Sequence, residues 1–159
     1  MENLDAIDIR LLKLLQENSR LTTKELAIEV GLSISPVYER VKRLENEGYI
    51  DRYVALLDPS KLNLSFIAFV AVKLKRQTKD GAQELIKAVM EIPEVTECFS
   101  VVGHYDYLLK VYAPDLNYYR NFVLDTLGNL ESVSNIESTF VMSVVKKTTA
   151  LPLQQLKKD

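Results

Sequence analysis

The spacing of apolar residues changes near residue 65, and this change constrains the fold more than any other feature of the chain. Before it, apolar side chains recur at helical intervals, as Ile7, Leu11 and Leu14 do. After it, the near-continuous apolar run 66–74 is typical of a strand that is covered on both faces. We therefore predict an α+β chain with two modules of different secondary structure.

The first sixty residues predict three helices, and the first two have clear start and stop signals. Asp5 is placed to cap the first helix with its side-chain oxygens. Thr22 and Glu25 have the spacing of a capping box at the start of the second helix. Gly31 then stands where a left-handed residue ends that helix. The second helix is therefore short, about two turns.

A third helix and an extended segment complete the first module. Ser35 is placed to cap this helix, with Pro36 in the first helical position, where a missing N–H costs nothing. Gly48 marks its end, and the run 49–57 has the composition of a strand. Two short helices joined by a tight Gly-containing turn and followed by a strand form a winged helix-turn-helix pattern, in which the second of the two is the recognition helix.

Helical geometry turns one face of the third helix outward. With Val37, Val41 and Leu44 set toward the core, the other side chains of its N-terminal half face solvent. This is the part of a recognition helix that meets base edges. The predicted DNA-binding residues are Ser33, Ser35, Pro36, Tyr38, Glu39, Arg40, Lys42 and Arg43.

The chemistry of these side chains suits a double-stranded DNA partner. Arg40 and Arg43 can pair with guanine or phosphate, and Glu39 can accept from cytosine N4. The serines and the helix N-terminus can donate to phosphate, and Tyr38 can touch a thymine methyl. The alternative is an ordinary solvated helix on which Glu39 and Arg43, four residues apart, form a surface pair.

The net charge of the first module opposes a strong attraction to phosphate. Residues 1–60 hold 8 Lys and Arg against 11 Asp and Glu, which is a net charge of −3. Phosphate binding needs a positive surface, and this overall balance does not supply one. DNA binding therefore depends on a local patch on one helix and on several copies that bind at once.

From residue 65 onward the predicted order is strand, helix, strand, strand, helix, strand, which is the ferredoxin-like βαββαβ arrangement. The expected strands are 66–74, 95–102, 107–112 and 136–145, and the expected helices are 80–91 and 116–127. The predicted domains are a helix-turn-helix domain 1–50, a linker strand and hinge 51–64, a ferredoxin-like domain 65–150 for effector binding and oligomerisation, and a C-terminal tail 151–159.

Several segments, in the right order, resemble the Lrp/AsnC family of feast/famine regulators. In the first module they are Glu25-Leu26-Ala27, Gly31-Leu32-Ser33 and the stretch from Ser35-Pro36-Val37 to Gly48-Tyr49-Ile50. In the second, Gly103-His104-Tyr105-Asp106-Tyr107 matches the family's Gly-x-x-Asp-Tyr turn. The resemblance covers nearly the whole chain. It implies a homodimer that assembles further, commonly into an octamer, and that responds to amino acids.

The resemblance also implies an effector site around the Gly103 turn, in a cleft between neighbouring dimers. An amino acid carries an ammonium, which Asp106 can hold, and a carboxylate, which backbone N–H groups of the turn can bind. The alternative is that Gly103 permits a tight hairpin while Asp106 bonds its own backbone. The predicted effector-binding residues are Gly103, His104, Tyr105 and Asp106 of the turn, with Thr139, Phe140 and Val141 at facing positions.

Other classes of function have little support in the sequence. With one His, one Cys and none of the phosphate or nucleophile motifs, we expect no enzyme, no metal site and no cofactor besides the amino-acid effector. The lone Cys98 and the lack of a signal peptide or long apolar run favour the cytoplasm, without a membrane partner. We therefore predict a sequence-specific transcriptional regulator. The alternative is an architectural, nucleoid-type DNA-binding protein with weak specificity and no effector.

Overall fold

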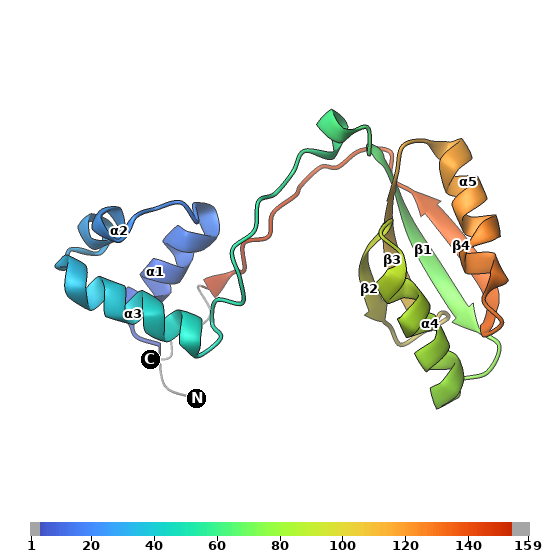
Figure 1. Cartoon of the computed structure of the whole chain (residues 1–159), viewed down its shortest axis with the longest axis horizontal. Helices are drawn as coiled ribbons and strands as arrows, with labels where there is room; N and C mark the ends of the chain where they lie inside the picture. The colour runs from blue at the N-terminus through green and yellow to red at the C-terminus, as the bar shows by residue number, and fades with distance from the viewer. Residues whose placement is uncertain (1–3, 154–159) are drawn as a thin grey trace. The chain divides into compact units, whose positions relative to one another are not determined.

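The computed structural model describes residues 4–153, which form two compact units (Figure 1). Unit 1 consists of the residues up to Leu56 together with a C-terminal segment that starts at Lys146, and unit 2 is Leu57–Val145. Residues 146–150 were predicted to belong to the ferredoxin-like domain, but in the structure they belong to unit 1 together with the three helices. Of the expected tail, residues 154–159 lie outside the described part of the chain.

The C-terminal segment is joined to unit 1 by a reciprocal pair of hydrogen bonds. The Gln16 side-chain amide donates to the carbonyl of Leu151 at 3.1 Å and accepts from the Leu151 N–H at 2.9 Å. The two residues are 135 positions apart in the chain. This long-range contact explains why local patterns placed the segment differently.

Unit 1 contains the three predicted helices, and the first two begin and end as predicted. The Asp5 side chain accepts from the N–H groups of Ile7 and Asp8, and Thr22 and Glu25 form the predicted capping box. Gly31 has φ 69°, a left-handed conformation that glycine adopts without a Cβ clash. The helices are α1 (Ala6–Glu17), α2 (Thr23–Val30) and α3 (Ile34–Asn46).

Helix α3 begins earlier than predicted. Its N-cap residue is Ser33, so Ser35 and Pro36 are the second and third helical residues instead of the cap and the first. Proline is tolerated there because the N–H groups of the first turn have no partner within the helix. Val37 and Leu44 are fully buried against α1 and α2, as predicted.

The strand predicted at 49–57 is not formed by the described residues. Residues 51–57 are exposed and have no strand assignment, and Val54, Leu56 and Leu57 expose at least 60% of their surface. An extended segment becomes a strand only when another strand pairs with its N–H and C=O groups. No such pairing of this segment is present in residues 4–153, so these residues do not form the wing of a winged helix-turn-helix.

Unit 2 has the predicted βαββαβ order and an antiparallel sheet with strand order β2-β3-β1-β4. Helices α4 and α5 pack on one face of this sheet, where Val70, Val72 and Leu109 meet Leu85 and Phe122 (Figure 1). The elements are η1 (Pro59–Leu62), β1 (Phe66–Leu74), α4 (Lys79–Glu91), β2 (Val95–Ser100), β3 (Tyr107–Ala113), α5 (Leu116–Asp125), η2 (Leu127–Asn129) and β4 (Val133–Phe140).

The last strand is shifted from its predicted span 136–145. It begins at Val133 and ends at Phe140, which pairs with Ala68 near the start of β1. One further bond, from the Val141 N–H to the Ile67 carbonyl, closes the ladder. Beyond that point β1 offers no more backbone partners, so the apolar run that follows stays outside the strand.

The face of the sheet opposite the helices carries apolar side chains that nothing in unit 2 covers. Phe69 is 36% exposed and Phe99 is 47% exposed. We call this surface the open sheet face; its apolar members are Ile67, Phe69, Ala71, Phe99, Leu108 and Tyr112, and the strand register places Lys110 and Glu137 on the same side. Among residues 4–153, no helix has the length and hydrophobicity needed to cross a bilayer.

Candidate DNA-binding surface and effector cavity

The N-terminal half of α3 presents a continuous exposed surface. Ser33, Ser35, Pro36, Tyr38, Glu39 and Lys42 are all exposed, as predicted from helical geometry. Tyr38 exposes 48% of its surface, and the Lys42 ammonium lies 6.0 Å from the centre of its ring. Lys42 also pairs with Glu45 at 2.9 Å. The surface therefore offers hydroxyl groups, one aromatic ring and one ammonium to a ligand.

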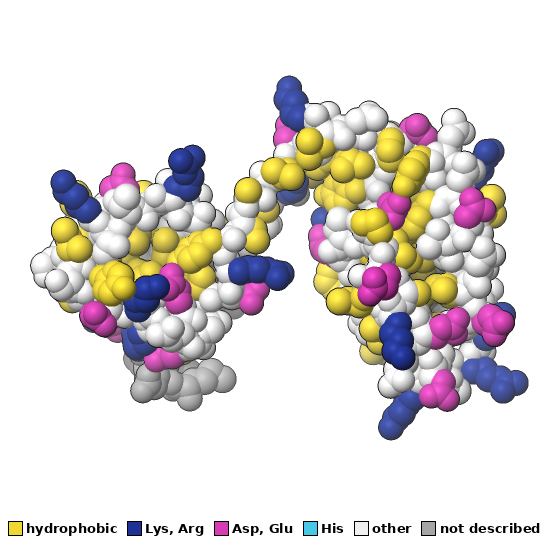
Figure 2. Space-filling view, in the orientation of Figure 1, with side chains coloured by type: hydrophobic (Ala, Val, Ile, Leu, Met, Phe, Trp, Pro, Cys, Tyr) yellow, Lys and Arg dark blue, Asp and Glu magenta, His cyan; other side chains and the backbone are white. Residues whose placement is uncertain are grey.

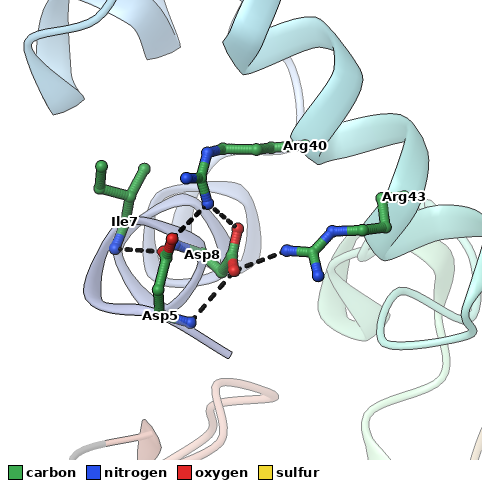
Figure 3. Close-up of polar contacts among 5 residues, drawn as sticks. All are labelled: Asp5, Ile7, Asp8, Arg40 and Arg43. Carbon is green, nitrogen blue, oxygen red and sulfur yellow. Dashed lines mark hydrogen bonds and ion pairs between the residues drawn. The ribbon is translucent and has the colours of Figure 1, made fainter. Parts of the chain in front are cut away.

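The two arginines of α3 were predicted to face outward, but both contact a buried carboxylate of α1. Figure 3 shows both guanidinium groups directed toward the start of α1, where they meet Asp8. Arg40 Nη1 lies 2.8 Å from Asp8 Oδ1, and Arg43 Nη2 lies 2.6 Å from Asp8 Oδ2. The Asp8 side chain is only 1% exposed. Each of its oxygens is therefore held by a guanidinium from α3.

Asp5 extends this network. Its carboxylate caps α1 and also accepts from Arg40 Nη1 at 2.6 Å, while its own N–H donates to Asp8 Oδ2 at 3.1 Å. Burial acts to raise the pKa of Asp5, but the hydrogen bonds from the Asp8 N–H and from Arg40 outweigh it and lower this pKa. Hydrogen bonds with the Asp8 carboxylate first, and then with the Asp5 carboxylate, raise the pKa of Arg40. We call Asp5, Asp8, Arg40 and Arg43 the α1–α3 clamp.

The clamp contains Arg40 and Arg43, the two arginines that were predicted to contact DNA. The negative charges of its two carboxylates balance the positive charges of its two guanidiniums. Elsewhere in unit 1, Arg10 pairs with Glu29 at 3.1 Å. Figure 2 shows Lys and Arg side chains interspersed with Asp and Glu over unit 1, on the face in view. No broad basic surface therefore appears on that face.

Sequence patterns contained a signal for the clamp that the prediction did not use. Asp8 precedes the buried Leu11 and Leu15 by three and seven residues, so it belongs to the buried stripe of α1. A carboxylate at such a position needs a charged partner. The prediction also omitted Ile34, which begins α3 and is 52% exposed beside the serines.

In unit 2, the turn between β2 and β3 borders a cavity of about 500 Å³. The cavity lies where this turn meets the end of β1 and the N-terminus of α4. Gly103, Tyr105 and Asp106 of the predicted effector site line it. The other lining residues are Leu74, Gln77, Thr78, Lys79, Ala82, Ser100, Val101, Val102 and Tyr107.

Asp106 braces the cavity wall. Its carboxylate accepts the Leu74 N–H at 2.8 Å and the Gln77 side-chain amide at 2.7 Å. Its backbone N–H donates to the Val72 carbonyl at 3.0 Å. The side chain thus bonds the neighbouring strand and the loop after it. A carboxylate offers about four acceptor sites, so two bonds leave capacity for a ligand ammonium.

The other predicted turn residues differ in their surroundings. Gly103 has φ 153°, and nothing lies within 4 Å of the position where a Cβ would stand. The backbone conformation, and not the space, therefore favours glycine there. His104 is exposed and outside the cavity lining, with its ring edge-on to Tyr105 at 5.1 Å between centroids.

Thr139, Phe140 and Val141 lie at the opposite end of the sheet from the cavity. Thr139 and Phe140 pair with Phe69 and Ala68, whereas the cavity adjoins Leu74. Leu74 lies six positions after Ala68 along β1, about 20 Å at the usual rise per residue. A single chain therefore does not bring the two halves of the predicted effector site together.

Within residues 4–153, no group of three His, Cys, Asp or Glu side chains is arranged to hold a metal ion. Cys98 is a free thiol on β2, and burial raises its pKa.

A helix-turn-helix unit joined to a ferredoxin-like unit with a ligand-sized cavity defines a class of two-domain DNA-binding proteins. Residues 4–51 match a family model described as winged helix-turn-helix DNA-binding. Residues 67–151 match the Lrp/AsnC ligand binding domain. The chain belongs to the Lrp/AsnC family of transcriptional regulators, which confirms the resemblance, the fold class and the main functional prediction.

Relatives match over almost the full length. A Bkd operon transcriptional regulator of Pseudomonas aeruginosa is 39% identical over 96% of this chain and 100% of its own. The leucine-responsive regulatory protein of Escherichia coli K12 is 39% identical over 96% of this chain and 93% of its own. A transcriptional regulator of Neisseria meningitidis, solved as an L-Met complex, superposes with a TM-score of 0.94 at 43% identity, over 98% of this chain and 100% of its own.

Proposed function

We propose that this regulator recognises specific DNA sites through α3 and that an amino acid bound at the cavity of unit 2 modulates its binding. The observation that carries the proposal is the combination, in one chain, of an exposed recognition-helix surface and a cavity beside the Gly103 turn. The cavity volume of about 500 Å³ is in the range of small-molecule sites.

The DNA-contacting surface is the exposed face of α3. When the N-terminal half of this helix enters a major groove, Ser33 and Ser35 donate to phosphate or base edges, and Lys42 reaches the backbone. Tyr38 and Ile34 can contact thymine methyl groups, and Glu39 can accept from cytosine N4. We assign Arg40 and Arg43 a different role, because both are held by Asp8.

The effector is an α-amino acid. The relative from Neisseria meningitidis was solved with L-Met, and another relative is named as leucine-responsive, which supports an amino acid here. Asp106 would bind the ligand ammonium, and N–H groups of the turn would bind its carboxylate. Leu74 and Ala82 give the cavity an apolar side. Thr139, Phe140 and Val141 would complete the site from a neighbouring copy.

Oligomers are part of the proposal because both sites need more than one chain. The open sheet face carries exposed apolar side chains, Phe69 and Phe99 among them, and a second copy of the chain is the partner that would bury them. A two-fold dimer presents two recognition helices to half-sites about 34 Å apart. Assembly beyond the dimer, to an octamer, would raise the affinity of a weakly charged surface through multiple contacts.

This assignment places the protein in the cytoplasm, in contact with DNA, without an enzymatic role and without a cofactor besides the amino acid. The alternative of an architectural protein predicts a low ratio of specific to non-specific affinity and a steep dependence on salt. The exposed base-reading side chains of α3 favour the gene-specific form.

Competition between DNA fragments tests the choice. A labelled fragment from upstream of the protein's own gene is bound, and unlabelled random-sequence DNA is added with and without L-Met or L-Leu. We expect at least a thousandfold excess of random DNA to be needed for displacement, in line with the usual specificity ratio, which is about that or more. Equal displacement by the two DNAs would favour the architectural protein. Retention that no amino acid of the twenty changes would remove the effector from the proposal.

A further inference from the structure

We infer that Asp8 is a positioning residue for DNA recognition: it fixes the orientation of α3 through Arg40 and Arg43, and neither arginine binds phosphate. The inference rests on the proposed DNA-binding function. It assigns to α1, which is not the recognition helix, a residue on which base reading depends.

The geometry of the clamp is suited to this role. Arg40 and Arg43 are three residues apart and therefore project from nearly the same side of α3. Their guanidiniums contact different oxygens of one carboxylate, at 2.8 Å and 2.6 Å. The carboxylate is itself anchored, because the Asp5 N–H donates to Asp8 Oδ2 at 3.1 Å. Two directional contacts on one fixed group define the rotation of α3 about its own axis.

The apolar contacts between the helices define that rotation less closely. Val37 and Leu44 pack against leucines of α1 and α2, and hydrophobic contact is largely non-directional. Charge-assisted hydrogen bonds are shorter and more strictly oriented. A small rotation of α3 would leave its apolar residues buried but would move Ser35, Tyr38 and Glu39 relative to the groove.

Burial makes the arrangement obligatory. Asp8 is 1% exposed, so its charge is tolerated only because charged donors surround it. The side chains of Arg40 and Arg43 are 28% and 34% exposed, and one terminal nitrogen of each guanidinium contacts Asp8. If either arginine left Asp8 to reach a phosphate, this buried carboxylate would lose one of its charged partners.

The salt dependence of DNA binding separates a positioning role from a phosphate contact. Each phosphate contact contributes about 0.9 to the slope of log affinity against log salt concentration. Lys42→Ala removes the exposed ammonium of α3 and is the matched control, so we expect its slope to fall by about one. We expect Arg40→Ala to keep the wild-type slope while its affinity for the specific fragment falls by roughly 5- to 150-fold, the equivalent of about one lost base contact.

A double-mutant cycle gives a second, independent measure. Fluorescence anisotropy with the upstream fragment is used for wild type, Asp8→Asn, Arg40→Ala and the double variant, after circular dichroism has shown which variants are folded. If Asp8 acts through Arg40, the affinity of the double variant for the fragment is about equal to that of whichever single variant has the lower affinity. Should Asp8→Asn fail to fold, the slope of Arg40→Ala decides alone.

Two results would overturn the inference: an Arg40→Ala slope that falls by as much as that of Lys42→Ala, or additive losses in the cycle. Both require a wild-type protein that binds the fragment. If the wild type binds no DNA at all, the proposed function fails, and that outcome is recognisable before any variant is made.

Discussion

Asp106 holds the end of β1 and the loop after it, and we propose that it also binds a ligand ammonium. A pair of substitutions separates these two roles. Asp106→Asn keeps an oxygen for the Leu74 N–H, which the carboxylate now accepts at 2.8 Å. The new NH₂ group would face Gln77, whose amide can turn and present its own oxygen. Asp106→Asn therefore keeps the hydrogen bonds to Leu74 and Gln77 but loses the negative charge.

The magnitudes follow from these contacts. The hydrogen bonds that remain in Asp106→Asn are neutral instead of charge-assisted, which reduces the free energy of unfolding by about 1 kcal/mol. Loss of a charged partner for the ligand ammonium removes about 1.5–3 kcal/mol of binding free energy, which weakens the Kd by roughly 10- to 150-fold. Asp106→Ala removes both acceptors and leaves the N–H of the buried Leu74 unpaired, so we expect it also to lose about 1–3 kcal/mol of stability.

Calorimetric titration with L-Met and L-Leu measures the binding, and thermal unfolding without ligand measures the stability. N-acetyl-L-methionine, which has no ammonium, is the control ligand, and we expect it to bind weakly to wild type and Asp106→Asn alike. The reasoning is refuted if Asp106→Asn binds L-Met as tightly as wild type, or if it is destabilised as much as Asp106→Ala.

Further predictions concern the open sheet face, the C-terminal segment and the clamp. Phe69→Glu places a charge on the open sheet face, so light scattering should show smaller assemblies, whereas Gln83→Glu on the exposed side of α4 should leave them unchanged; an intact oligomer in Phe69→Glu would exclude this face. Gln16→Ala removes both bonds to Leu151 and should reduce the stability of unit 1 by about 1 kcal/mol in urea unfolding, whereas the adjacent Glu17→Ala should not; equal effects would deny the segment a specific role. The lowered pKa of Asp5 means that its contribution to stability is present above its ordinary pKa of 3.8 and is lost as the pH falls through the lower folded value. Asp5→Asn should therefore flatten the acid limb of a stability–pH profile, and an unchanged limb would contradict the assignment.

Local signals predicted most of the secondary structure because they act over a few residues. The Asp5 cap, the Thr22 capping box and the Gly31 stop each depend on contacts within one helical turn, and all three are present. The change of apolar period at residue 65 predicted the ferredoxin-like unit for the same reason. The start of α3 was misplaced because Ser33 and Ser35 are both acceptable caps, and proline fits more than one position of a first turn.

The errors concern features that depend on distant partners. The segment 49–57 has a strand-like composition but no strand beside it, and β4 ends where β1 stops offering backbone groups. Arg40 and Arg43 were assigned outward positions, whereas their partner Asp8 lies 32 and 35 residues away in the chain. Helical periodicity gives the direction of a Cα–Cβ bond, but the far end of an arginine follows the nearest buried charge.

A footprint of the protein on DNA from upstream of its own gene tests the central claim most directly. If α3 reads specific sequence from a two-fold dimer, nuclease protection will fall on short half-sites about one helical turn apart on one face of the duplex, and L-Met or another amino acid will change its strength or extent. The same protection on shuffled DNA of equal composition, unaffected by any amino acid, would contradict the account.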